Sequence, residues 1–252
     1  MFRKGKKLDE ANNLFNRGLE AVNKENPPYN KIYDIFENAK TLYEKIGDNG
    51  KQGEQECEAY LRMIEGYQQR QKEGWIECMK AFGRANVLFS ANKNDKMAKK
   101  MRYEQAVAQG DFAKQKALNG EFTESARLYE SSAAVFQMIG MEKEAAGARG
   151  KSYVQRAAQV QDDFQKSNFL AKAVEEFRKA HDLNPIIEAH ALFYRGRSLI
   201  GVKVREAIQN LTRAQEKYER IGATEQVNRV KQIIEELNQS IKDRPSEYGL
   251  RG

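Results

Sequence analysis

The 252-residue sequence is poor in the residues that build strands and turns. It contains only four threonines, four prolines and 18 glycines. Sheets favour threonine and other β-branched residues, whereas helices favour alanine, glutamate, lysine and glutamine, which are plentiful here. No apolar run approaches the roughly 20 residues that span a bilayer. The composition therefore predicts an all-α protein and argues against a β-rich fold or a transmembrane helix.

Residues that carry catalysis or bind metals are equally scarce. Cys57 and Cys78 form no CxxC pair, and His181 and His190 have no ligand partner at metal-binding spacing. No phosphate-binding glycine loop, dinucleotide fingerprint or nucleophile-elbow motif occurs. We therefore predict no enzyme activity, cofactor, metal or small-molecule substrate. Both cysteines are expected in helix interfaces, and both histidines on the surface or at helix ends.

Charge and the N-terminal sequence suggest a location. The first residues, MFRKGKKLDEANN, are basic but lack the apolar stretch of a secretory signal. Two cysteines are too few for a disulfide framework, so a cytoplasmic protein is expected. The net charge of +7 is modest for this length, and the densest basic run, 93–102, has the composition of ordinary solvated surface.

The apolar residues recur with a helical period between short breaks that contain glycine, asparagine or aspartate. About eleven helices follow from this pattern, joined by connections short enough to make consecutive helices antiparallel neighbours. Gly47, Gly140 and Gly222 are expected to end helices, and Ser167 to cap the start of one. The expected ranges are 8–26, 30–46, 51–72, 75–92, 95–118, 122–139, 142–165, 168–183, 186–200, 204–221 and 224–242.

The even-numbered helices of this series share one spacing of large and small residues. Three matching sets are Phe36, Ala39, Tyr43 and Ile46; Tyr129, Ser132, Phe136 and Ile139; and Leu211, Ala214, Tyr218 and Ile221. A large residue three positions before a small one places a knob beside a notch that a neighbouring helix can enter. Five notch residues are therefore expected to be buried between helices, namely Ala39, Ala85, Ser132, Ala180 and Ala214.

The distance between matching positions predicts a repeat of about 46 residues that contains two helices. On this basis, residues 1–242 form a single helical-repeat domain. The last helix carries one narrow apolar stripe, which suits a helix that covers the end of a stack. The segment 243–252 has no core-forming pattern and is expected to be a mobile tail.

One segment, FLAKAVEEFRKAHDLNP (169–185), resembles the second helix of a tetratricopeptide repeat. Ala173, Phe177, Ala180 and Pro185 stand at the small, aromatic, small and proline positions of that motif. VREAIQNLTRAQEKY (204–218) matches it less fully, and the preceding first helices fit it poorly. The resemblance implies a right-handed superhelical α-solenoid of antiparallel helix pairs.

A longer segment, ESARLYESSAAVFQMIGMEKEAAGARGKSYVQRA (124–157), is similar to the soluble NSF attachment proteins, which act in vesicle fusion. Two departures matter. The connection 24–30 lacks the apolar membrane-touching loop of that family, and SEYGLRG at the C-terminus is not its acidic, leucine-bearing end. The similarity therefore implies a fold in this SNAP-like style and does not extend to the fusion role.

Basic residues recur on the odd-numbered helices, which line the concave, commonly partner-binding face of a stacked-pair solenoid. The candidate partner-binding residues are Arg62, Lys100, Arg102, Arg149, Arg156, Arg195 and Arg197. Because Arg149 and Arg156 are seven residues apart, they share a helix face. Arginine forms charge-assisted and often bidentate bonds with carboxylates. The hypothesis is a non-catalytic scaffold or adaptor that binds a protein partner through an acidic segment.

Three alternatives remain beside this hypothesis. The same residues could be solvated surface without a partner. A nucleic-acid-binding repeat protein would need one merged basic stripe with exposed aromatics, and the mixture with 36 acidic residues disfavours it. A peripheral membrane-trafficking adaptor of SNAP type would use the basic N-terminus, where one phenylalanine and four cations make a marginal anchor.

Overall fold

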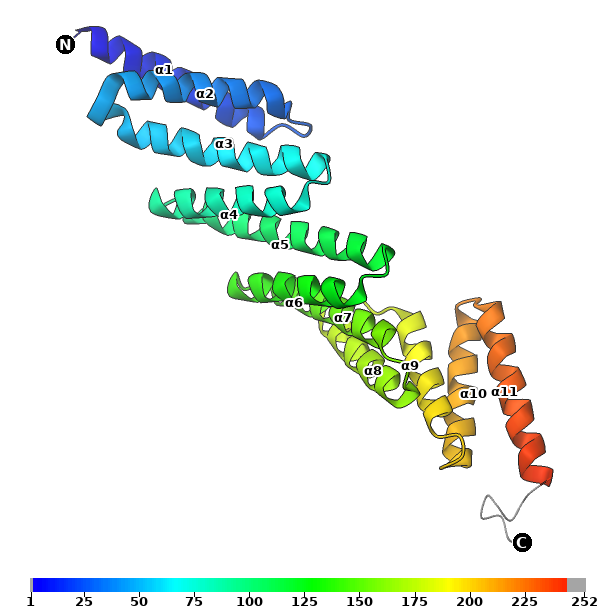
Figure 1. The fold of residues 1–252 in the computed structure, drawn as a ribbon. Helices are drawn as coiled ribbons and strands as arrows, with labels where there is room; N and C mark the ends of the chain where they lie inside the picture. The colour runs from blue at the N-terminus through cyan, green and yellow to red at the C-terminus, as the bar shows by residue number, and fades with distance from the viewer. Residues whose placement is uncertain (1, 244–252) are drawn as a thin grey trace. The chain divides into compact units, whose positions relative to one another are not determined.

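A computed structural model describes residues 2–243, with side chains from residue 5 onward. This part of the chain consists of α-helices and one short 3-10 helix, contains no strand, and confirms the all-α prediction (Figure 1). The helices are α1 (Phe2–Val22), α2 (Tyr29–Ile46), η1 (Gly47–Gly50), α3 (Lys51–Gln71), α4 (Trp75–Ala91), α5 (Asp95–Leu118), α6 (Phe122–Met138), α7 (Glu142–Gln159), α8 (Asp163–Lys179), α9 (Pro185–Ser198), α10 (Val204–Arg220) and α11 (Thr224–Asp243).

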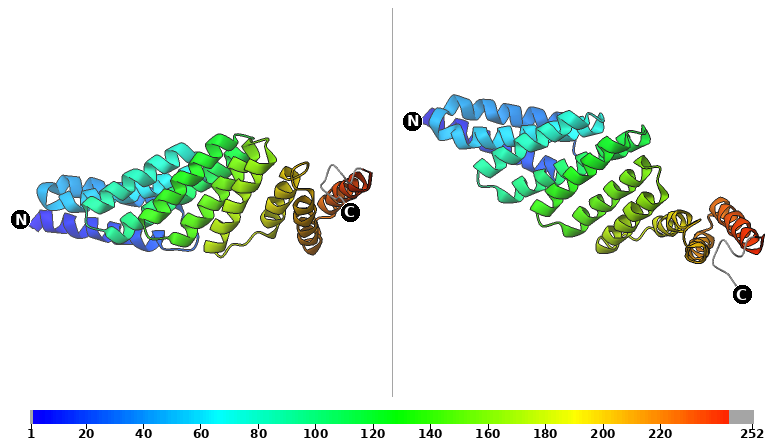
Figure 2. Two further views of the ribbon diagram at one scale, coloured as in Figure 1. Left: turned by 90° about the horizontal axis from the view of Figure 1, so that it is seen from below. Right: turned by 60° about the horizontal axis from the view of Figure 1, so that its bottom comes forward.

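The chain divides into two compact units. Unit 1 comprises Met1–Phe112 with Met138–Gly140, and unit 2 comprises Ala113–Gln137 with Met141–Gly252. In unit 1, α1 packs on α2, α2 on α3, and α3 on α4. In unit 2, α7 packs on α8, α8 on α9, α9 on α10, and α10 on α11, and the further views show α10 beside α11 (Figure 2). The predicted neighbour packing is thus present within each unit.

Left-handed backbone conformations follow most of the helices. Gly47, Gly140 and Gly222 have φ angles of 77°, 74° and 71°, which confirms that glycine ends these helices. Three non-glycine residues adopt the same conformation in equivalent turns, and these are Glu73, Lys93 and His181. A side chain carries a steric cost in this region, so these three turns hold a conformation that glycine adopts more readily.

Three predicted helix boundaries are wrong by five or six residues. α7 ends at Gln159 rather than at 165, and α8 begins at Asp163 rather than at 168. The cap of α8 is Asp162, whose side-chain oxygen accepts a hydrogen bond from the Gln165 backbone N–H at 2.7 Å. Ser167 therefore lies inside the helix, where its hydroxyl donates to the carbonyl of Phe164. The first helix also begins six residues earlier than predicted, at Phe2.

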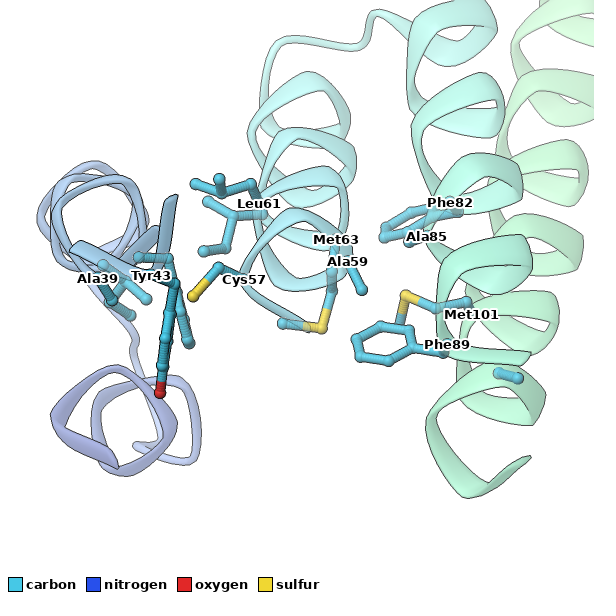
Figure 3. Packing of buried hydrophobic residues seen from close by; sticks show 14 of the residues in the cluster. Ala39, Tyr43, Cys57, Ala59, Leu61, Met63, Phe82, Ala85, Phe89 and Met101 are labelled. Carbon is cyan, nitrogen blue, oxygen red and sulfur yellow. The ribbon is translucent and has the colours of Figure 1, made fainter. Parts of the chain in front are cut away.

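Aromatic rings fill the core of unit 1. Phe36 stacks on Tyr60 with ring centroids 4.9 Å apart, and Phe15 and Phe89 contact Tyr60 edge-on. Figure 3 shows the sulfur atoms of Met63 and Cys57 among buried side chains of this core such as Leu61, Phe82 and Phe89. Both cysteines are buried, as predicted, and burial raises the pKa of the Cys57 thiol to about 12 and that of the Cys78 thiol to about 11.

Large residues of one helix pack directly on glycines of the preceding helix. A Cβ atom added to Gly66 in α3 would stand 2.5 Å from the Phe82 ring in α4. In unit 2, a Cβ atom added to Gly150 in α7 would stand 2.9 Å from the Phe177 ring in α8. Both distances are shorter than real carbon contacts, so the two helices approach closely only because glycine lacks a side chain.

The predicted notch residues are mostly buried. Ala39, Ala85, Ser132 and Ala214 are buried between helices, which confirms the expectation for these four. Ala180 is only half-buried, because α8 ends at Lys179 and leaves this residue in the terminal turn. The predicted tail 243–252 lies outside the described residues except for Asp243, which is the last residue of α11.

Candidate functional site

The seven predicted binding residues fall into two sets, one in each unit. Unit 1 contains Arg62 in α3 with Lys100 and Arg102 in α5. Unit 2 contains Arg149 and Arg156 in α7 with Arg195 and Arg197 in α9. Each set is therefore considered inside its own unit.

In unit 1, Arg62 is held by its own helix. Its guanidinium lies 2.6 Å from a Glu58 oxygen and 2.9 Å from a Glu65 oxygen. The hydrogen bonds that Arg62 donates to Glu65 and to Glu58 raise the pKa of Arg62 against the effect of burial. Lys40 of α2 also binds Glu58, at 2.8 Å. Lys100 and Arg102 lie exposed on α5 and belong to no comparable network among the described residues.

Unit 2 carries two neighbouring depressions along α6 and α7, which together we call the α6–α7 groove. Their volumes are about 190 Å³ and 250 Å³. Glu130 lines both. The first is also lined by Ala133, Ala134, Gln137, Arg149, Ser152 and Tyr153. The second is also lined by Thr123, Ala126, Arg127, Arg156, Gln159, Val160 and Phe169.

Small residues form much of the α6 side of this groove. Ala126, Ala133 and Ala134 line the depressions at positions spaced by seven and one along the helix. Alanine side chains allow another backbone to approach closely, because they fill little of the space beside the helix. The groove thus combines a shallow apolar wall with cationic side chains from α6 and α7.

Arg149 is anchored by a nearly buried carboxylate. Its Nε donates to Glu176 of α8 at 2.7 Å, and Lys179 donates to the same carboxylate at 2.6 Å. Burial alone would raise the pKa of Glu176, but the hydrogen bonds from Lys179 and Arg149 outweigh it and lower the pKa. The Glu176 side chain is only 11% exposed, so this carboxylate orients Arg149 from below the surface.

Arg156 is paired differently. Its guanidinium forms a close ion pair with Glu130 of α6, and the Ser152 hydroxyl donates to the same Glu130 oxygen at 3.2 Å. The side chains of Arg156 and Glu130 are 42% and 43% exposed. This pair therefore lies at the solvent boundary of the groove, where an incoming molecule can reach it.

Arg195 and Arg197 do not line the α6–α7 groove as the structure describes it. The Arg197 Nε lies 3.0 Å from a carboxylate oxygen of Asp163, and the Arg195 guanidinium stands 5.3 Å from the centre of the Phe164 ring. Both interactions join α9 to the first turn of α8. The interactions described for Arg195 and Arg197 thus lie at the α8–α9 contact, apart from the ion pairs of Arg149 and Arg156.

Sequence reasoning did not identify the two glutamates that bind these groove arginines. Glu130 and Glu176 lie 26 and 27 residues from the arginines that they bind, so no local spacing connects them. The alanine positions of α6 were a usable signal, because Ala126 and Ala133 repeat every seven residues on one helix face.

A second cavity, in unit 1, was also missed. It has a volume of about 480 Å³, and Phe15, Tyr60 and Phe89 contribute aromatic side chains to it. Its charged lining is balanced, and consists of Lys93, Lys96, Glu56 and Asp95. Two cations and two anions select no sign of ligand charge, so electrostatics does not indicate what this cavity would bind.

His190 departs from its prediction as a surface residue. It lies half-buried in α9, with Nδ1 2.5 Å from the hydroxyl of the buried Tyr218 in α10. Burial lowers the pKa of His190, which favours the neutral imidazole. The unprotonated nitrogen of a neutral imidazole can accept a hydrogen bond from the Tyr218 hydroxyl, and the pair joins α9 to α10.

Across the described part of the chain, no cluster of three histidine, cysteine or carboxylate side chains is arranged to hold a metal ion. None of the helices in that part is both long and apolar enough to cross a membrane. A scan against models of known protein families finds no match, and a search of curated protein sequences finds none either.

Proposed function

We propose that the protein is a non-catalytic, cytoplasmic scaffold or adaptor that binds an acidic segment of a protein partner in the α6–α7 groove. The supporting observation is the charge of the groove lining. Arg127, Arg149 and Arg156 contribute three positive charges, against one negative charge from Glu130. An acidic segment is the class of protein ligand that this excess attracts.

The spacing of the arginines indicates the form of the segment. Arg149 and Arg156 are separated by seven residues of α7, which corresponds to about 10 Å along the helix axis. Two carboxylates that lie seven residues apart on a partner helix, which is about two turns, have the same separation. The alanine side chains on the α6 side of the groove favour the close approach of such a helix.

The test uses a labelled alanine-based peptide with two glutamates seven residues apart, and measures fluorescence anisotropy. The double variant Arg149→Ala/Arg156→Ala should bind the peptide roughly 5- to 30-fold more weakly, because two half-exposed charge pairs contribute about 1–2 kcal/mol together. Binding by the wild type should also weaken as salt rises, since salt screens exposed charges.

The matched control is Arg213→Ala/Arg220→Ala. These two arginines are exposed on α10 of the same unit and are also seven residues apart, so the variant loses the same charge at the same spacing. Equal weakening in both variants would assign binding to net charge and overturn the groove. Competition by a single-stranded oligonucleotide that depends on Arg149 and Arg156 would instead favour the nucleic-acid alternative.

A further inference from the structure

Glu130 occupies the middle of the proposed binding site and already holds one of its arginines. It lines both depressions, binds the Arg156 guanidinium and accepts the Ser152 hydroxyl. A partner carboxylate that approached Arg156 would therefore meet a carboxylate from the protein itself.

The two internal carboxylates differ in how firmly they are held. Glu176 is 11% exposed and accepts hydrogen bonds from two cations, Arg149 and Lys179. Glu130 is 43% exposed and has one cationic partner. A solvent-exposed ion pair contributes little free energy, whereas breaking a buried pair is far more costly. Glu130 is thus displaceable, and Glu176 is not.

Resting on the proposed function, we propose that Glu130 is an internal competitor that determines the specificity of the α6–α7 groove. In the absence of a partner it neutralises Arg156 and engages the Ser152 hydroxyl. On binding, a partner carboxylate takes over both donors, and the Glu130 side chain turns toward solvent. Arg149 keeps its internal partner Glu176 and contributes its remaining N–H donors to the second partner carboxylate.

This exchange explains which ligands the groove selects. A neutral polar segment gains little at Arg156, because it would replace a charge-assisted bond by a weaker neutral one. A segment with a single carboxylate must offset the loss of the Glu130 contact and gains little net energy. A segment with two carboxylates obtains the additional contact at Arg149, so specificity arises partly from a repulsive residue in the site.

The test is the conservative variant Glu130→Gln, studied with the same two-glutamate peptide. Glutamine keeps the shape of the side chain but removes its charge, so Arg156 becomes available to the peptide. We expect up to about fivefold tighter binding at low salt, corresponding to the contribution of one exposed ion pair. The gain should shrink as salt rises.

The matched control is Glu124→Gln, which removes the same charge from an exposed position of α6 outside the groove. Glu130→Ala, checked for retained helical circular dichroism, provides a second variant without an amide at this position. Tighter binding by both Glu130 variants but not by Glu124→Gln supports the proposal. For a peptide with glutamine in place of both glutamates, none of these variants should have a measurably higher affinity than the wild type.

Two results would overturn the inference in distinguishable ways. Binding by the wild type that is unchanged or weakened in both Glu130 variants would refute the internal competitor and leave the acidic-partner groove standing. Absence of binding in the wild type and in both Glu130 variants alike would refute the groove itself, because the freed arginine would then also fail to attract the peptide.

Discussion

Unit 1 fills the space between its helices with aromatic rings, whereas α7 of unit 2 is buried through small residues. Phe15, Phe36, Tyr60 and Phe89 form a continuous series of ring contacts in unit 1. The buried residues of α7 are Ala145, Ala146, Ala148, Gly150, Ser152 and Ala157. Aromatic rings are large enough to fill the space between two helices. Small residues leave no gap there only when the helices lie close together.

The difference bears on where polar chemistry is found. Small buried residues leave the long side chains of α7 to define its surface, and two arginines there meet glutamates from α6 and α8. In unit 1, the network of Tyr67 and Arg70 with Glu104 and Asp111 joins α3 to α5 beside the aromatic core. The two units therefore share one packing device, a large residue on glycine, but combine it with different surroundings.

The largest expected effect comes from removing the large residue of this device in unit 1. Phe82 is completely buried, packs on Gly66, and has its ring centroid 5.1 Å from that of Tyr67. Phe82→Ala should therefore destabilise the protein by about 3–5 kcal/mol. Segment-resolved hydrogen exchange in increasing denaturant should show the loss in α3 and α4.

The matched variant in unit 2 is Phe177→Ala, which removes the phenylalanine ring that packs on Gly150. A smaller loss is expected, since aromatic pairs such as Phe82 with Tyr67 add about 0.5–1.5 kcal/mol beyond burial. A loss in Phe177→Ala as large as that in Phe82→Ala would remove the energetic distinction between the two units.

An intermediate effect is expected from adding volume where small residues pack. Ala214 of α10 is fully buried, so Ala214→Leu forces extra methylenes into a filled interface and should cost roughly 1–3 kcal/mol. Chemical denaturation monitored by circular dichroism measures the change. Ala171→Leu, at an exposed position of α8, is the control and should leave stability nearly unchanged. An unaltered midpoint for Ala214→Leu would contradict the close packing of this helix.

The smallest effect concerns pH and distinguishes the units because both histidines of the chain lie in unit 2. The folded pKa of His190 is below the unfolded value of about 6.5. The unfolded chain therefore binds the proton more readily, and stability should fall as the pH drops from about 6.5 through the folded pKa.

His190→Gln keeps a hydrogen-bond acceptor near the Tyr218 hydroxyl but does not titrate. Amide hydrogen exchange, corrected for its intrinsic pH dependence, gives the free energy of unfolding of α9 and α10. Between about pH 7 and pH 5, this free energy should change less in the variant than in the wild type. His181→Gln is the control, because His181 is exposed in the turn after α8. Identical pH dependence in the His190 variant and the wild type would show that protonation of His190 does not affect stability.

The sequence predicted helix boundaries well wherever glycine marked a turn. α2, α6 and α10 end within one residue of their predicted positions, next to Gly47, Gly140 and Gly222. The predictions failed at 160–162, where the chain is extended at Val160 and Asp162 and no glycine occurs. α8 also ended earlier than predicted, because His181 adopts the left-handed conformation that glycine usually signals.

The candidate groove could be predicted only in part. The seven-residue spacing of Arg149 and Arg156 correctly places both residues along one helix face that lines the groove. Their partners Glu130 and Glu176 come from the flanking helices, and pairing across helices depends on their rotation and not on local spacing. The same limit applies to the glycines at 66 and 150, which pack on rings that belong to another helix.

Packing between helices that are adjacent in sequence also bears on synthesis at the ribosome. Each unit contains a series of helices that pack on the one that emerged just before them, α2 to α4 in unit 1 and α8 to α11 in unit 2. The chain thus gains tertiary contacts without waiting for distant segments, and little of its apolar surface stays uncovered for long during elongation. α11 emerges after α10 and covers it with Val227, Val230 and Leu237. We therefore expect nascent chains that stop before Thr224 to engage chaperones through the uncovered side of α10.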